Sequence, residues 1–262
     1  MRNQKLFQVD AFAEKVFQGN PAAVVVTAEE LPVSLMQSIA NENNLAETAF
    51  VFGDPEMLKI RWFTPTVEVD LCGHATLAAA HVLMTEYQMN DRLTFQSKSG
   101  PLNVQSEDSM LWLDFPADSF DQSDHHTTRK VEQALNSNVV SVYRGKSDLM
   151  AVLESQEVLT HLEPTMDDIS KLNCRGLIVT AAGNEVDFVS RFFAPQVGVP
   201  EDPVTGSAHT TLIPYWSERL QKDDLRARQL SFRGGSLSCV MHTDRVRIGG
   251  HAITYLRGSI SI

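Results

Sequence analysis

The stretch Gly73-His74-Ala75-Thr76 decides the fold, because the chain repeats it in its second half. It follows Phe63-Thr64-Pro65 and a short irregular run, and it opens an apolar segment. In the second half, Phe193-Ala194-Pro195 and another irregular run lead to Gly206-Ser207-Ala208-His209, which opens a second apolar segment. A repeat of this length exceeds the units of about 20–50 residues that build solenoids. It predicts two homologous lobes, with a site between them lined by corresponding loops.

The length of the chain agrees with this division. A chain of 262 residues is long enough for two domains of ordinary size. We expect an N-terminal lobe over residues 1–117 and a C-terminal lobe over 118–262, with the last strand a candidate to cross back to the first lobe. The polar run 118–129, rich in Asp, Ser and His, is the predicted linker.

Periodicity predicts mostly strands around a few helices. Strands are expected where apolar and β-branched residues alternate or cluster, namely at 6–11, 22–27, 48–53, 58–64, 110–115, 177–181 and 186–194. An amphipathic helix is expected at 31–41, entered through Pro32. Segment 71–84 is apolar on nearly all sides, which is typical of a buried helix, and segment 208–220, with Leu212, Ile213, Tyr215 and Trp216, is its predicted counterpart. The sequence therefore predicts an α+β fold in which antiparallel strands surround one central helix per lobe.

The composition excludes several classes of partner. A formal net charge of -11 argues against nucleic acid or an anionic membrane surface as the main partner. No apolar run approaches the ~20 residues that a membrane helix needs, and the first residues lack the apolar core of a signal peptide. Cys72, Cys174 and Cys239 are odd in number and lack CxxC spacing, which disfavours disulfides and zinc. We expect a cytoplasmic protein.

The two glycines of the repeat predict an anion site. Gly73 and Gly206 each stand where a loop becomes a helix, and the first turn of a helix offers unpaired N–H donors and a partial positive charge. Two such ends facing one cleft would hold a small carboxylate without an Arg or Lys. The alternative is that both glycines only serve tight turns.

Groups that can move or hold protons cluster around these helix starts. His74 follows Gly73, and Asp202 and Ser207 flank Gly206. Taken alone, Asp202 is equally typical of a turn residue, and Ser207 is equally typical of an N-cap residue. Glu47 precedes a strongly apolar strand, where a carboxyl group on the buried side could exchange protons with a substrate.

These motifs together resemble the PhzF-like phenazine-biosynthesis isomerases, within the diaminopimelate-epimerase-like superfamily. The resemblance covers nearly the whole chain and is carried by several stretches: Phe7–Phe12, Gly19–Ala22, Glu47–Phe50, Phe63–Pro65, Asp70–Thr76, Glu201–Ala208 and Ile248–Gly250. It implies two barrel-like lobes, each around a central helix, in a homodimer that acts on a small carboxylate substrate without cofactor or metal.

The same resemblance implies a role for each site residue. Glu47 would move a proton between carbons, with His74 and Asp202 as its catalytic partners. Ser207, Gly206, Gly73 and Cys72 would bind the substrate.

Two other functions remain open at this point. Cys72-Gly73-His74 is similar to the Cys-Gly-Asn stretch of diaminopimelate epimerases and proline racemases, which place a second cysteine in the other lobe. Thr205 stands at that second position and is a poor base, so a racemase would need Cys72 and Glu47 as its two bases. The third possibility is a binding protein that lost its chemistry, although Glu47, His74 and Asp202 are all present.

Overall fold

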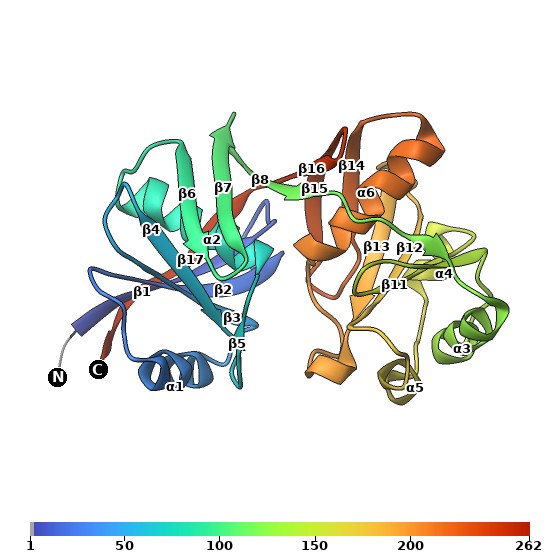
Figure 1. Cartoon of the computed structure of the whole chain (residues 1–262), viewed down its shortest axis with the longest axis horizontal. Helices are drawn as coiled ribbons and strands as arrows, with labels where there is room; N and C mark the ends of the chain where they lie inside the picture. Colours follow the sequence, from blue (N-terminus) through green and yellow to red (C-terminus); the bar gives the residue numbers. More distant parts are fainter. Residues whose placement is uncertain (1–2) are drawn as a thin grey trace. The chain divides into compact units, whose positions relative to one another are not determined.

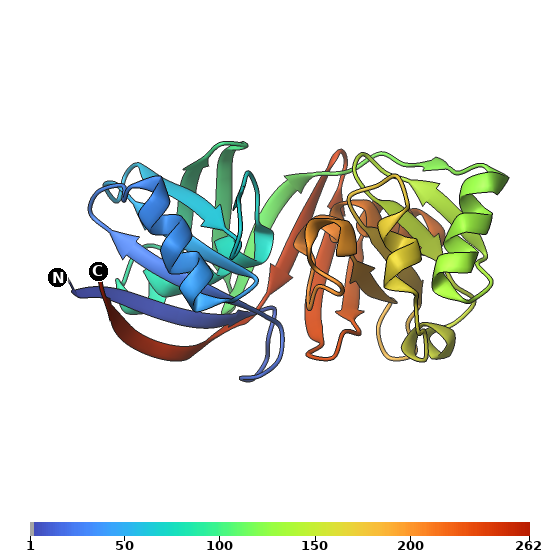
Figure 2. The ribbon, with the colours of Figure 1, turned by 90° about the horizontal axis from the view of Figure 1, so that it is seen from below.

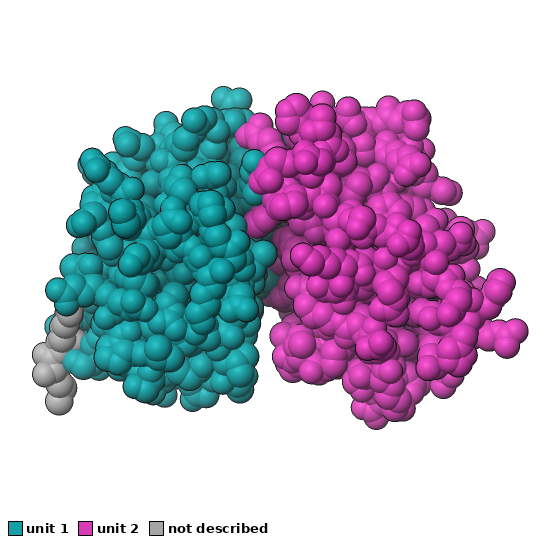
Figure 3. Space-filling model, viewed as in Figure 1, with its two compact units in different colours: residues 1–114, 249–262 teal, residues 115–248 magenta. Residues whose placement is uncertain are grey.

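The chain folds into two compact units in the computed structural model, which describes residues 3–262. One unit consists of the chain up to Asp114 together with Gly249–Ile262, and the other consists of Phe115–Ile248 (Figure 3). The C-terminal segment thus belongs to the first unit. There β17 (Ala252–Ser261) pairs antiparallel with β1 (Asn3–Ala11), and the two strands run side by side (Figure 2).

The first unit is built mainly from strands. Besides β1 and β17 it contains β2 (Asn20–Thr27), α1 (Val33–Asn43), β3 (Glu47–Phe52), β4 (Leu58–Phe63), β5 (Glu68–Val69), α2 (Gly73–Glu86), β6 (Arg92–Ser97), β7 (Gly100–Glu107) and most of β8 (Met110–Pro116) (Figure 1).

The second unit has more helices. It contains β9 (Asp121–Gln122), α3 (His125–Leu135), β10 (Ser141–Arg144), β11 (Leu149–Val152), α4 (Gln156–Thr160), α5 (Met166–Ser170), β12 (Leu177–Ala182), β13 (Phe188–Phe193), the 3₁₀ turn η1 (Pro195–Val197), α6 (Gly206–Leu220), β14 (Asp224–Gln229), β15 (Gly235–His242) and most of β16 (Arg245–Gly250) (Figure 1).

The order of strand pairings is the same in both units. In the first, β1–β2 is antiparallel, β2–β3 parallel, β3–β4 antiparallel, β4–β6 parallel and β6–β7 antiparallel. In the second, β10–β11, β11–β12, β12–β13, β13–β14 and β14–β15 follow the same alternation. This shared order confirms the predicted α+β fold of two similar lobes.

Each unit packs its sheet against one apolar helix. In α2, all residues from His74 to Ala80 are buried, as are Val82 and Leu83, and the helix contacts β1, β2, β3 and β17. In α6, Trp216 stacks on Phe188 of β13 and its indole N–H donates to Thr180 Oγ1 of β12 at 2.9 Å. Because most residues of both helices are buried, packing against the sheet removes their apolar surface from water.

The predicted strands are confirmed, whereas the predicted helices differ from the observed ones by about two residues at one or both ends, and the predicted linker is partly helical. Helix α1 begins at Val33 and not at residue 31, because Pro32 is its N-cap residue. The predicted linker 118–129 is helical from His125 onward. Asp124 caps this helix by accepting a hydrogen bond from the Thr127 N–H at 2.7 Å, which satisfies one of the unpaired donors of its first turn. Among residues 3–262, no helix is long and apolar enough to cross a membrane.

Candidate active site

Helix α2 begins at Gly73 without a side-chain cap from the described part of the chain. Cys72 is the N-cap residue. The hydroxyl of Thr76 donates to the carbonyl of this N-cap residue at 2.6 Å. The first turn contains no acidic side chain, so the positive end of the helix is not neutralised from within the helix itself.

His74 occupies the second position of α2 and is almost completely buried. Its Nδ1 lies 3.2 Å from the Asn20 side-chain amide, at the start of β2, and 3.5 Å from the Cys72 sulfur. Its Nε2 lies 3.1 Å from Glu47 Oε2. The ring is therefore held on one side and faces a carboxylate on the other.

Glu47 is the first residue of β3, and its side chain is only 18% exposed. Parallel pairing with β2 sets Glu47 beside Ala22, which brings the carboxylate to the same end of the sheet as Asn20. Glu47 Oε2 and His74 Nε2 are both buried, and neither has an aligned hydrogen-bond partner among the residues that the structure describes. The two atoms therefore face each other at ion-pair distance without an aligned hydrogen bond.

The two titratable neighbours of Glu47 respond to burial differently. For Cys72, burial raises the pKa of the thiol, and the nearby negative charge of Glu47 raises it further. For His74, burial by itself lowers the pKa, but Cys72 and Glu47 raise it by more, so that it lies well above its usual value. The imidazole thus holds a proton readily, whereas the thiol is a poor base.

Glu47, Cys72 and His74 also offer one sulfur, one nitrogen and one oxygen within 4.8 Å of one another, a set that could hold a metal ion such as zinc. However, Cys72 contacts Nδ1 of the ring and Glu47 contacts Nε2. Because the two ring nitrogens face different partners, the arrangement suits proton transfer better than a shared ion.

The start of helix α6 in the second unit resembles the start of α2. We call these two loop-to-helix junctions the α2 corner and the α6 corner. Thr205 is its N-cap residue, and the ring of His209 takes the role of Thr76 by donating from Nδ1 to the Thr205 carbonyl at 2.9 Å. The Thr205 hydroxyl donates to Asp202 Oδ2 at 2.5 Å. Gln229 of β14 braces this loop, because it accepts from the Thr205 N–H at 2.8 Å and donates to the Asp202 carbonyl at 2.7 Å.

An arginine stands at the start of α6, a group that the predicted anion site did not include. Arg175 Nη2 donates to Ser207 Oγ at 3.0 Å, and the same guanidinium forms a two-pronged ion pair with Asp148. Gly206 is buried at the first helical position. The corner therefore combines backbone donors, a hydroxyl and a guanidinium.

The structure groups the predicted site residues by unit. Glu47, Cys72, Gly73 and His74 gather at the α2 corner, and Asp202, Gly206 and Ser207 gather at the α6 corner.

Sequence reasoning missed four polar residues that support these groups: Asn20, Asp148, Arg175 and Gln229. Asn20 lies within a stretch that carried the family resemblance, but no role was assigned to it. The other three belong to no motif and had no recognisable signal.

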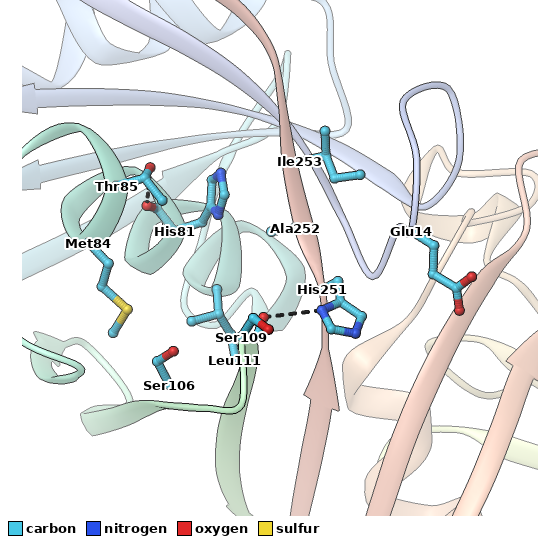
Figure 4. A pocket seen from close by; sticks show the side chains of 10 residues that line it. All are labelled: Glu14, His81, Met84, Thr85, Ser106, Ser109, Leu111, His251, Ala252 and Ile253. Atoms are coloured by element: carbon cyan, nitrogen blue, oxygen red, sulfur yellow. Dashed lines mark hydrogen bonds between the residues drawn. The ribbon is translucent and has the colours of Figure 1, made fainter.

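A half-open cavity of about 540 Å³ lies elsewhere in the first unit, near the C-terminal end of α2. Its wall includes His81, Met84 and Thr85 of α2 together with His251 and Ile253 of the C-terminal segment (Figure 4). His81 Nε2 lies 3.0 Å from Thr254 Oγ1, and His251 Nδ1 lies 3.1 Å from the Ser109 carbonyl oxygen. None of the predicted site residues lines this cavity.

Comparisons with known proteins agree over the whole chain. The model of the PhzC-PhzF family, described as phenazine biosynthesis-like protein, matches residues 9–258. An uncharacterized isomerase of Pseudomonas aeruginosa is 52% identical over 256 residues, covering 97% of each chain. The phenazine biosynthesis-like domain-containing protein of Homo sapiens is 38% identical over 283 residues, covering 98% of each chain.

Solved structures show the same fold. The PhzF-family phenazine biosynthesis protein of Enterococcus faecalis has a TM-score of 0.96 at 44% identity and covers all of both chains. A hydroxyproline epimerase from Agrobacterium vitis has a TM-score of 0.61 at 9% identity, covering 99% of this chain and 92% of the epimerase, and this likeness concerns the fold alone.

Proposed function

Because the chain belongs to the PhzC-PhzF family, we propose that it is a cofactor-independent isomerase that moves a proton between carbons of a small carboxylate substrate. Glu47 is the general acid/base. The observation that carries this proposal is the contact between Glu47 and His74, where a buried carboxylate oxygen lies 3.1 Å from an imidazole nitrogen and both lack an aligned partner among residues 3–262. A carboxylate held in this way beside an imidazole can act as a general base toward a substrate carbon.

The reaction is a proton shift in two steps. Glu47 first removes a proton from a carbon that an adjacent unsaturated system acidifies, and the electrons of the broken C–H bond pass into that system. The resulting Glu47 carboxylic acid then returns the proton to a second carbon on the same face, where a new C–H bond forms. Atoms and electrons balance within the substrate, and one base within ~3 Å of both carbons suffices.

The remaining residues bind and orient the substrate. His74, with its raised pKa, donates a proton to a substrate oxygen and balances the charge of Glu47 as the latter gains and loses its proton. We assign substrate contacts to Gly73 and Cys72 at the start of α2. We assign them also to Gly206 and Ser207 at the start of α6, where Asp202, fixed by Thr205, interacts with the polar or nitrogen-bearing side of the substrate.

The racemase alternative has less support. It requires Cys72 to act as a thiolate, but burial and the charge of Glu47 raise the pKa of this thiol. Its counterpart Thr205 is engaged with Asp202 and offers no second base.

Incubation in deuterated water with a panel of small unsaturated carboxylates, followed by NMR, tests the proposal. We expect deuterium at a migrated position with retained handedness. Label at an inverted stereocentre would instead identify an epimerase. Binding without any exchange would leave only a binding protein and would overturn the proposal.

A further inference from the structure

The Arg175 guanidinium joins a buried carboxylate to the hydroxyl of Ser207. Nε donates to Asp148 Oδ1 at 2.9 Å, and Nη2 donates both to Asp148 Oδ2 and to Ser207 Oγ, the latter at 3.0 Å. Asp148 is only 4% exposed. Because a guanidinium is planar and meets a carboxylate with two parallel bonds, this pair fixes the direction of the remaining Nη2 proton toward Ser207.

Arg175 is also held from its other sides. Its guanidinium lies over the Phe192 ring, 5.5 Å from the ring centroid, and its backbone N–H donates to the Ser147 carbonyl at 2.8 Å. The Phe192 carbonyl in turn accepts from the Asp202 N–H at 3.0 Å. The arginine is therefore part of the framework that carries the loop before α6.

The contact with Arg175 decides what the Ser207 hydroxyl can do. A hydroxyl oxygen that accepts from a guanidinium keeps its own proton for donation to another acceptor. Without that contact, a serine in the first turns of a helix can rotate and bond to nearby backbone instead. The guanidinium thus selects the rotamer in which Ser207 donates.

We propose that Arg175, braced by Asp148, is a positioning residue that holds the Ser207 hydroxyl as a hydrogen-bond donor to a substrate oxygen. This inference rests on the proposed function, because it takes Ser207 to be a substrate-binding residue. Arg175 acts through Ser207, so its importance should vanish when the hydroxyl is absent.

A double-mutant cycle tests this step with the substrate identified by deuterium exchange. Arg175→Lys keeps the positive charge but loses the two-pronged contact with Asp148. We expect it to raise KM about tenfold with little change in kcat, and we expect the same of Ser207→Ala. The double variant should match Ser207→Ala alone, since acting through a shared partner makes the effects non-additive. Arg257→Lys, which alters an ion pair to Glu86 at the C-terminal end of α2, should leave KM unchanged and serves as the control.

Each result separates the two proposals. Effects of Arg175→Lys and Ser207→Ala that multiply in the double variant would show that Arg175 acts independently of Ser207, which overturns this inference and leaves the proposed function intact. If the wild-type protein exchanges no substrate proton, the proposed function fails instead. A crystal structure of the Arg175→Lys variant gives a readout without substrate: a changed Ser207 rotamer is expected, and an unchanged one contradicts the positioning role.

Discussion

Glu47 and His74 meet at 3.1 Å through two buried atoms that have no aligned hydrogen-bond partner in the described part of the chain. The other nitrogen of the ring is held beside Asn20 and Cys72, so the imidazole cannot easily turn away from the carboxylate. When the imidazole is protonated, the two groups form a close ion pair. We propose that a substrate binds beside this pair.

Replacing Glu47 by Gln should abolish proton exchange and preserve binding. The amide keeps the shape of the side chain but cannot accept a proton from carbon, so we expect the exchange rate to fall by about 10²–10⁴-fold. The measurement is deuterium incorporation by NMR, with ligand-induced thermal shift as the test of binding. Glu42→Gln, on the exposed face of α1, is the matched control. Exchange at the wild-type rate in Glu47→Gln would rule out this residue as the base.

Replacing Cys72 by Ser should leave most of the activity. Because burial and Glu47 raise the pKa of the thiol, little thiolate is available to act as a base, and we expect the rate to stay within about fivefold of wild type. Steady-state kinetics of the variant, with circular dichroism as the check on folding, measures this. A folded Cys72→Ser protein without activity would favour the epimerase mechanism.

His209 should make stability depend on pH between about 4 and 6.5. Burial lowers its pKa to about 4, whereas in the unfolded chain it is ~6.5. Between these values the unfolded chain binds a proton that the folded chain does not, so this contribution is complete above ~6.5 and falls by roughly 3 kcal/mol as the pH drops to 4.

Thermal unfolding across this range checks the His209 prediction. The unfolding midpoint of His209→Gln should fall less steeply with decreasing pH than that of wild type, because the titrating group is gone. The control variant His242→Gln, altered at an exposed histidine, should follow the wild-type curve. Parallel curves for all three proteins would show that His209 is not the group responsible.

The backbone of α2 should be the slowest part of the first unit to exchange its amide hydrogens. Residues from Ala75 to Ala80 are completely or almost completely buried, so their hydrogen bonds open only when much of the unit unfolds. Hydrogen–deuterium exchange with mass spectrometry can compare peptides over 77–83 with peptides from α1, whose outer face is exposed. Equal rates in the two helices would contradict a central, enclosed α2.

The repeat and the apolar helices could be predicted because their signals are local. Apolar residues on nearly all sides of 71–84 indicate burial whatever surrounds them, the large apolar residues of 208–220 indicate the same, and glycine where a loop becomes a helix is visible in the sequence itself. The start of α3 was missed for a related reason. Asp124 looked like one polar residue in a polar run, although its position three residues before Thr127 makes it a cap.

The sequence by itself determined that this protein has two similar α+β lobes and which residues begin the helices that matter, since periodicity and backbone preference act over a few neighbouring residues. The tertiary structure decided which side chains those residues meet. Asn20 reaches His74 across 54 positions and Arg175 reaches Ser207 across 32, and both contacts depend on strand register and loop path. Such pairings arise only when segments distant in the chain pack together, which is why no local motif predicts them.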